Sequence, residues 1–124
     1  MMVISTAIVQ AILLVIFLIS GVGKVCGALM HVQNFERLQL PQWFRVVTGT
    51  VQLIGVAGLA VGYFYSYWAT MAGIWLALTM IGAVLAHVRI RDSLKQTAAP
   101  VVLFCLAVVF VVYFLPNSSP IVSL

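Results

Sequence analysis

Residues 46–88 have the sequence VVTGTVQLIGVAGLAVGYFYSYWATMAGIWLALTMIGAVLAHV, which contains no charged side chain. A helix needs about 20 mainly apolar residues to cross the hydrocarbon core of a bilayer. This stretch is long enough for two such helices, and only Tyr65 and Ser66 separate them. Because so short a connection makes consecutive helices antiparallel neighbours, it predicts a hairpin that crosses a membrane twice, over residues 46–64 and 67–87.

The composition of the whole chain indicates the same environment. Of its 124 residues, 65% are hydrophobic and 6% are charged, whereas soluble domains are about 45–50% apolar and about 25% charged. A soluble domain of this length has too little interior for so much apolar surface. Two more apolar runs, 3–22 and 98–115, complete four predicted spans. We therefore expect an all-α fold, a four-transmembrane-helix bundle that forms a single integral membrane domain over residues 1–124.

Three details refine this bundle. Residues 1–20 lack the basic n-region and the cleavage site of a signal peptide, so we expect the first span to be retained. Pro100 is expected in the first turn of the fourth span, where its missing N–H costs nothing. Glycines at GxxxG spacing indicate close packing between helices; they are Gly23 with Gly27, and Gly58 with Gly62.

The charged side chains fall in two windows, which hold Lys24, Glu36, Arg37 and Arg45, and then Arg89, Arg91, Asp92 and Lys95. The windows follow the first and third spans, so both lie on one side of the membrane. Because this side holds all six Lys and Arg, the positive-inside rule places it in the cytoplasm and both termini outside. The net charge of +4 suits the anionic headgroups of a lipid bilayer, and we expect no nucleic-acid partner. The expected location is a bacterial cytoplasmic membrane.

The connection between the first two spans has a helical pattern of its own. Its apolar side chains recur every three residues, at Leu29, Val32, Phe35 and Leu38. This pattern predicts a short amphipathic helix over residues 29–40, lying in the membrane interface. Pro41 ends it, because the residue before a proline disfavours helix.

Polar side chains are few in the spans, and most belong to the half of the bundle near the charge windows. If a pocket exists there, the candidate ligand-binding residues are Lys24, Gln52, His87, His31 and Arg45. Gln52 predicts either a hydrogen bond between helices or a ligand contact. Thr48 and Thr50 of the same span lie close enough in sequence to be partners of its amide. Lys24 either extends its ammonium to the headgroups or anchors an anionic or carbonyl-bearing molecule.

The two histidines do not predict a metal site, because no carboxylate lies at ligand spacing from them. His87 is either interfacial or a group that titrates near neutral pH, and His31 is expected to be exposed to solvent. Asp92 lies three residues from both Arg89 and Lys95, which is typical of a solvated helix end.

The two cysteines carry little chemical signal. Cys26 and Cys105 form no C-x-x-C pair. Cys105 lies inside an apolar run, where a thiol is usually a small buried hydrophobe. We therefore favour packing over redox chemistry for both, and whether they ever pair stays open.

Four segments of the chain resemble the DoxX-like membrane proteins: FLISGVGK (17–24), FERLQLP (35–41), GTVQLIG (49–55) and AHVR (86–89). The resemblance covers about residues 14 to 110 and implies a four-helix membrane bundle. Its motifs are a G-x-x-K at the end of span one and a G-x-x-E-x-x-G in span two, where this chain has Gln52 in place of the glutamate. It also implies kinship with a subunit of a thiosulfate:quinone oxidoreductase and with relatives that act in assembly or oxidative-stress complexes.

Three functions are compatible with the sequence. The first is an accessory or assembly subunit of a membrane complex, quinone-linked or concerned with oxidative stress, with a membrane or redox protein as partner. The second is binding of a quinone- or lipid-like molecule in the cytoplasmic half of the bundle. The third is a small multidrug-type transporter, a class that relies on a glutamate in its first span where this chain offers only Gln10. No catalytic constellation is visible, and a homo-oligomer is compatible with all three.

Overall fold

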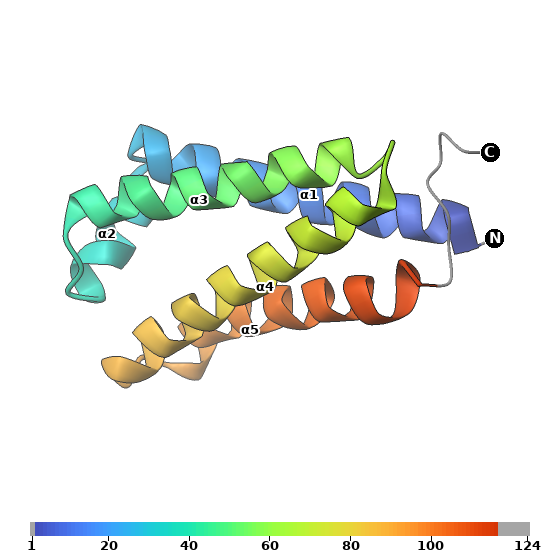
Figure 1. Cartoon of the computed structure of the whole chain (residues 1–124). Helices are drawn as coiled ribbons and strands as arrows, with labels where there is room; N and C mark the ends of the chain where they lie inside the picture. The colour runs from blue at the N-terminus through green and yellow to red at the C-terminus, as the bar shows by residue number, and fades with distance from the viewer. Residues whose placement is uncertain (1, 117–124) are drawn as a thin grey trace.

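The computed structural model describes residues 2–116, which form five α-helices and one short π-helix (Figure 1). Their bounds are α1 (Met2–Cys26), α2 (Leu29–Arg37), α3 (Gln42–Val61), α4 (Ser66–Arg89), α5 (Leu94–Val109) and η1 (Phe110–Phe114). Four segments are long and apolar enough to cross a membrane: Val3–Cys26, Gln42–Val61, Ser66–Arg89 and Leu94–Phe114. The predicted all-α fold, with four spans and a short helix between the first two, is confirmed.

The long helices pack as two pairs that diverge from one end of the bundle to the other. α1 lies beside α3 and α4 beside α5, and the α3–α4 turn joins the pairs (Figure 1). The start of α1 and η1 also lie at this end, which we call the turn end. α2 and the α4–α5 connection lie at the opposite, charged end. There the Arg37–Asp92 ion pair, 2.9 Å long, joins the two charge windows, so they share one side of the bundle as predicted.

Residues with left-handed backbone end the three helices that finish at the charged end. Gly27, Gln39 and Arg91 have φ of 77°, 58° and 53°. After each, the next N–H donates to a carbonyl five residues earlier, which is the Schellman arrangement; the pairs are Ala28 with Gly23, Leu40 with Phe35, and Asp92 with His87. These caps set the helix ends, so α1 continues beyond the predicted residue 22 and α2 stops before the predicted residue 40.

The fourth span begins at a cap that its hydropathy does not reveal. Ser93 Oγ accepts a hydrogen bond of 3.2 Å from the Gln96 N–H, and α5 starts at Leu94 rather than at residue 98. Pro100 therefore lies inside α5, and its predicted place in the first turn was wrong. Because proline has no N–H, the carbonyl of Gln96 loses its helical donor.

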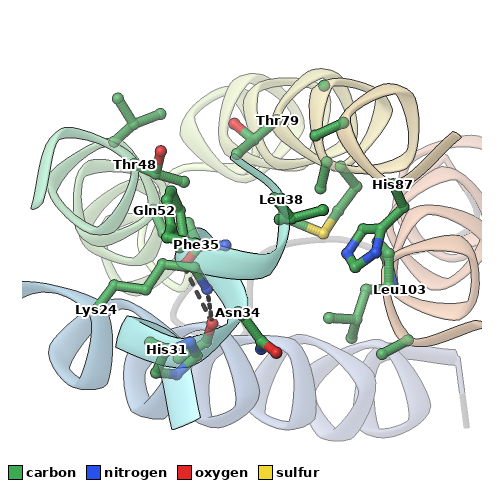
Figure 2. A pocket seen from close by; sticks show the side chains of 18 of the residues that line it. Lys24, His31, Asn34, Phe35, Leu38, Thr48, Gln52, Thr79, His87 and Leu103 are labelled. Carbon is green, nitrogen blue, oxygen red and sulfur yellow. Dashed lines mark hydrogen bonds between the residues drawn. The ribbon is translucent and has the colours of Figure 1, made fainter. Parts of the chain in front are cut away.

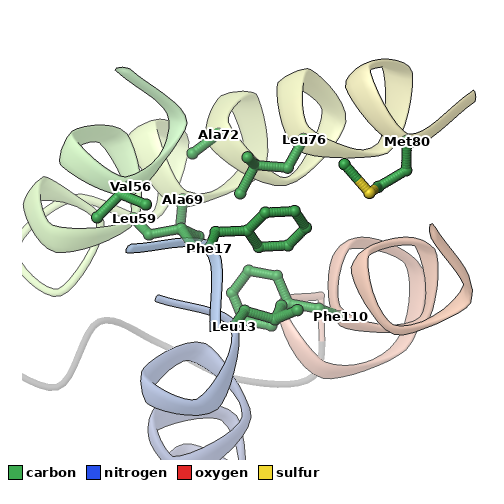
Figure 3. Close-up of a cluster of buried hydrophobic side chains, with 9 residues drawn as sticks. All are labelled: Leu13, Phe17, Val56, Leu59, Ala69, Ala72, Leu76, Met80 and Phe110. Carbon is green, nitrogen blue, oxygen red and sulfur yellow. The ribbon is translucent and has the colours of Figure 1, made fainter. Parts of the chain in front are cut away.

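A hydrophobic cluster fills the bundle from its middle to the turn end (Figure 3). Phe17, Leu59 and Phe110 in it are fully buried, and the whole set is Leu13, Phe17, Val56, Leu59, Ala69, Ala72, Leu76, Met80 and Phe110. Two alanines of α4 pack against Gly58 of α3 and against Gly62, the residue that caps α3. A Cβ built on Gly62 would lie 2.5 Å from the Cβ of Ala69, and one on Gly58 would lie 2.8 Å from that of Ala72.

Two expectations about small residues fail. Gly27 lies in the cap that ends α1, so its spacing from Gly23 is not a helix-packing motif like that of Gly58 and Gly62. Cys105 is exposed on α5 rather than buried, and Cys26 is also exposed, both as free thiols. Within a membrane span, an exposed face is a face toward lipid, and apolar side chains there need no protein partner.

Candidate ligand-binding site

A cavity of about 620 Å³ lies at the charged end, where the helix pairs diverge. This volume is in the range of small-molecule pockets, about 300–1,000 Å³. All four spans and α2 contribute to its wall, which is mainly apolar. Its main polar side chains are Ser20, Lys24, His31, Asn34, Thr48, Gln52, Thr79, His87 and Gln96.

A chain of hydrogen bonds joins Lys24 to α3 along one wall of the cavity (Figure 2). Lys24 Nζ donates to Ser20 Oγ at 2.6 Å, and Ser20 Oγ donates to Gln52 Oε1 at 3.2 Å. Ser20 is one helical turn deeper in the span than Lys24. The ammonium therefore points toward the middle of the bundle, and the alternative in which it extends outward to the headgroups does not describe this conformation.

Gln52 makes the hydrogen bond between helices that the sequence predicts, but with a different partner. It is 2% exposed, and its partner is Ser20 of α1. The hydroxyls of Thr48 and Thr50 donate instead to carbonyls one turn earlier in α3, at 2.8 and 2.9 Å. A threonine in a helix often forms this local bond, so the hydroxyls nearest in sequence are already used.

His87 lines the opposite wall of the cavity and is held by Asp92 (Figure 2). The Schellman cap of α4 turns the chain back, and His87 Nδ1 comes within 2.6 Å of Asp92 Oδ2. Nδ1 is the donor when the carboxylate is ionised, which leaves Nε2 as the ring nitrogen available to a ligand.

Asp92 belongs to an ion pair between the two charge windows rather than to a solvated helix end. Its partner is Arg37 of α2, and its carboxylate is only 8% exposed. The expected pairing with Arg89 and Lys95 was wrong, and Arg89 donates to the Leu38 carbonyl. Burial alone would raise the pKa of Asp92, but hydrogen bonds from His87, Arg37 and the Ser93 N–H hold it below its usual value.

His31 is buried, although we expected it to be exposed to solvent. It is 8% exposed, and its ring lies where a side chain on Gly23 would be, 2.9 Å from the position of a Cβ there. Burial, and then the nearby positive charges of Lys24 and Arg45, hold the pKa of His31 below its usual value. The neutral imidazole is therefore the form that the cavity wall favours.

Arg45 is the one candidate that does not line the cavity. Its guanidinium donates to the carbonyl of Lys24 and to Gln42 Oε1, the latter at 2.8 Å. Gln42 in turn donates to the Val32 carbonyl at 3.2 Å. Arg45 thus ties the start of α3 to the end of α1, behind the wall. The structure brings the other four candidates to one cavity.

Sequence reasoning missed Ser20, Asn34, Thr79 and Gln96 as polar members of the wall. Ser20 could have been found, because it precedes Lys24 by four residues and so shares its helix face. Asn34 and Gln96 could not, because they meet only when α2 folds back toward α5. Among residues 2–116, no three His, Cys, Asp or Glu side chains form a group that could hold a metal ion.

Comparison with known proteins places this bundle in a family. Residues 8–110 match the DoxX-like family. The chain belongs to this family. It is also 32% identical over 89 residues to the uncharacterised protein YdgD of Bacillus subtilis (strain 168), an alignment that covers 70% of this chain and 78% of YdgD. No solved structure matches the chain. The resemblance found in the sequence is confirmed, and the matched region contains every residue of the cavity wall.

Proposed function

We propose that this DoxX-like protein binds a membrane-soluble, quinone- or lipid-like molecule in the cavity at its charged end. The observation that carries the proposal is the meeting of Lys24, Gln52 and His87 around a mainly apolar space of about 620 Å³. Pockets of this kind bury an apolar ligand and fix its orientation with a few polar groups. Sequence position alone does not bring these three side chains together, because they come from α1, α3 and α4.

The polar groups suit a ligand with hydrogen-bond acceptors at its head. An ammonium has three N–H donors and no acceptor, and in the described residues only Ser20 accepts from Lys24. His87 lines the other wall of the same space, and when its neutral ring donates from Nδ1 to Asp92, Nε2 can accept from a hydroxyl of the ligand. A carbonyl or anionic oxygen next to Lys24 would satisfy donors that otherwise have no partner.

The test is to identify what the protein retains. The protein is purified from its native membrane in mild detergent, and small molecules are extracted and identified by mass spectrometry. We expect a stoichiometric amphipathic compound in the wild type and its loss in Lys24→Ala and Gln52→Leu. The matched controls are Lys95→Ala and Gln33→Leu, which change exposed residues outside the wall. Equal retention by all five proteins would overturn the proposal.

The charge distribution supports an orientation with both charged loops in the cytoplasm and both termini outside. All six Lys and Arg belong to the charged end, and the relative in Bacillus subtilis supports a bacterial cytoplasmic membrane as the location. Alkaline phosphatase fused to the C-terminus is active only when exported. We expect an active fusion, and an inactive one would reverse the orientation.

The sequence also allowed an accessory subunit and a small multidrug-type transporter. An accessory or assembly subunit stays a prediction, as does a homo-oligomer, and copurification of a stoichiometric protein would support the former. The transporter alternative needs an ionisable group along its path. Gln10 is 3% exposed and donates to the Leu59 carbonyl at 2.7 Å, so it joins α1 to α3 and supplies no ionisable group to such a path.

A further inference from the structure

The charged end holds a positive charge that no carboxylate balances. Both ion pairs of the described residues use Asp92, which pairs with Arg37 and His87. No carboxylate lies within 4.0 Å of Lys24 or Arg45 in residues 2–116. Lys24 also directs its ammonium into the cavity, toward Ser20. A cation held inside a membrane protein normally has a counter-charge or faces water.

Exposed apolar side chains of three spans line the cavity. They are Ile19 (68%), Val47 (44%) and Leu78 (62%), and in a bilayer their exposed surface would face lipid. At the charged end, by contrast, α2 covers the cavity with the buried side chains of Phe35 and Leu38. A molecule dissolved in the bilayer would therefore have an apolar path to Lys24 between the spans.

The contacts between α3 and α4 support the same path. Trp75 Nε1 donates to the Val51 carbonyl at 2.8 Å and joins the two helices. Beyond this bond, toward the charged end, Thr48 and Thr79 face each other across the cavity (Figure 2). Gly82 lines the cavity, and a Cβ built on it would have no atom within 4 Å.

We infer that the ligand is a single-chain amphiphile with an anionic oxygen headgroup, which enters from the bilayer and pairs its headgroup with Lys24. The inference rests on the proposed function and narrows it, because a neutral quinone would leave the charge of Lys24 unbalanced. The apolar wall holds the start of the chain, and the remainder leaves between the spans into lipid. The headgroup chemistry is that of a long-chain carboxylate or of a single-chain phosphate lipid.

The experiment compares charged and neutral probes of the same chain. Delipidated protein is titrated with oleate, with oleyl alcohol and with an oleoyl lysophosphatidylglycerol in neutral buffer, and bound ligand is measured by native mass spectrometry. Charge-assisted hydrogen bonds contribute more than neutral ones. We expect oleate or the phosphate lipid to bind at least about tenfold more tightly than oleyl alcohol, and the preferred anion identifies the headgroup.

Substitutions at Lys24 test the contact with the headgroup, and substitutions at Gly82 test binding in the cavity. Lys24→Met should abolish the preference for the anion, and a melting temperature close to that of the wild type would show that the variant is folded. Lys95→Met, which removes the same charge from an exposed position, should keep the preference. Gly82→Phe fills the cavity and should weaken all three probes, whereas Gly82→Ala should not.

The outcomes distinguish two failures. If oleyl alcohol binds as tightly as both anions and Lys24→Met changes nothing, the anionic headgroup is excluded while binding in the cavity stands. If no probe binds the wild type more tightly than it binds Gly82→Phe, the cavity is not a ligand site and the proposed function fails as well.

Discussion

The two ends of this bundle use similar side chains in opposite ways. At the turn end three polar side chains bond to the backbone of another element: Gln10 to Leu59, Tyr63 to Ala7, and Thr6 to Phe114. At the charged end Ser20, Lys24 and His87 bond instead to other side chains, and all three line a cavity. Gln10 and Gln52 are both almost fully buried. Gln10 only joins α1 to α3 through its hydrogen bond to Leu59, whereas Gln52 lines the cavity in which we propose that a ligand binds.

Small residues explain why one end is closed and the other open. At the turn end, two glycines lie against alanines of α4: Gly58 of α3 against Ala72, and Gly62, which caps α3, against Ala69. Toward the charged end, α4 offers Gly82, which has no neighbour in the space where a side chain would be. Two helices held together at one end and unsupported at the other diverge, and the divergence creates the cavity. The contrast between Gly62 and Gly82 is therefore testable by substitution.

The largest effect is expected at the closed end, from Gly62→Val. Its Cβ would lie 2.5 Å from the Cβ of Ala69, 2.8 Å from its Cα and 2.9 Å from its backbone nitrogen. Backbone atoms cannot yield as the tip of a side chain can, so we expect a loss of about 3 kcal/mol or more in folding free energy. Thermal unfolding followed by circular dichroism in detergent measures it. A melting temperature equal to that of the wild type would mean that the α3–α4 contact does not hold the bundle together.

The next comparison sets Gln10→Leu against Gln52→Leu. Removing the bond from Gln10 to Leu59 should cost about 0.6–2 kcal/mol, the usual value of such a bond between membrane helices, and should leave ligand retention unchanged. Gln52→Leu should cost less folding free energy, because its bond to Ser20 is longer, at 3.2 Å against 2.7 Å. It should reduce ligand retention, because Gln52 and its neighbours line the cavity. Paired measurements of melting temperature and retained ligand test both. If the two variants change melting temperature and ligand retention alike, then Gln10 and Gln52 do not have the separate structural and ligand-binding roles assigned to them.

The sequence predicted most of the fold because the bilayer imposes it. Apolar runs between charge windows gave four spans, and the two-residue link at Tyr65 and Ser66 gave the α3–α4 hairpin. The errors lie at helix ends. Hydropathy does not register the left-handed caps at Gln39 and Arg91, because neither is a glycine, nor the Ser93 cap that leaves Pro100 inside α5.

The candidate site was predicted in part, by depth rather than by contact. Lys24, Gln52, His87 and His31 were grouped because they belong to the same half of the bundle, and all four line the cavity. Depth could not distinguish Arg45, which has the same depth but ties helix ends together behind the wall. Pairings across the fold, such as Arg37 with Asp92, depend on where α2 folds back, and sequence spacing contains no information on that.

A smaller effect is expected at the open end, from Gly82→Ala. The added methyl enters empty space, and alanine in a helix is more stable than glycine by about 0.5–1 kcal/mol. We therefore expect a slightly raised melting temperature and unchanged ligand retention. Gly58→Ala is the matched control at the closed end, where the new Cβ would lie 2.8 Å from that of Ala72, and it should be destabilising. Destabilisation by Gly82→Ala would show that α4 is packed there and that the cavity is not open.

The smallest effect concerns pH and the cover that α2 forms over the cavity. Burial next to Lys24 and Arg45 lowers the pKa of His31 in the folded protein, whereas a free histidine has a pKa of about 6.5. Below that pH, His31 takes up a proton in the unfolded state but not in the folded state. The free energy of unfolding therefore decreases as the pH falls from about 6.5 to the lowered pKa of the folded protein. Asp92 has a separate window: its pKa is also lowered, so its contribution is lost only as the pH falls below about 3.9.

The pH dependence of melting temperature between neutral and mildly acidic buffer tests the contribution of His31. We expect the wild type to melt at progressively lower temperature as the pH falls below about 6.5, and His31→Gln to remove that part of the dependence. Lys95→Met serves as the control, since it changes a charge at the same end without contacting His31, and it should keep the wild-type slope. The same slope in His31→Gln would assign the dependence to another group and would leave α2 as a cover that does not respond to pH. Because α2 contributes no residue to the central hydrophobic cluster, its loosening should leave the closed end of the bundle intact.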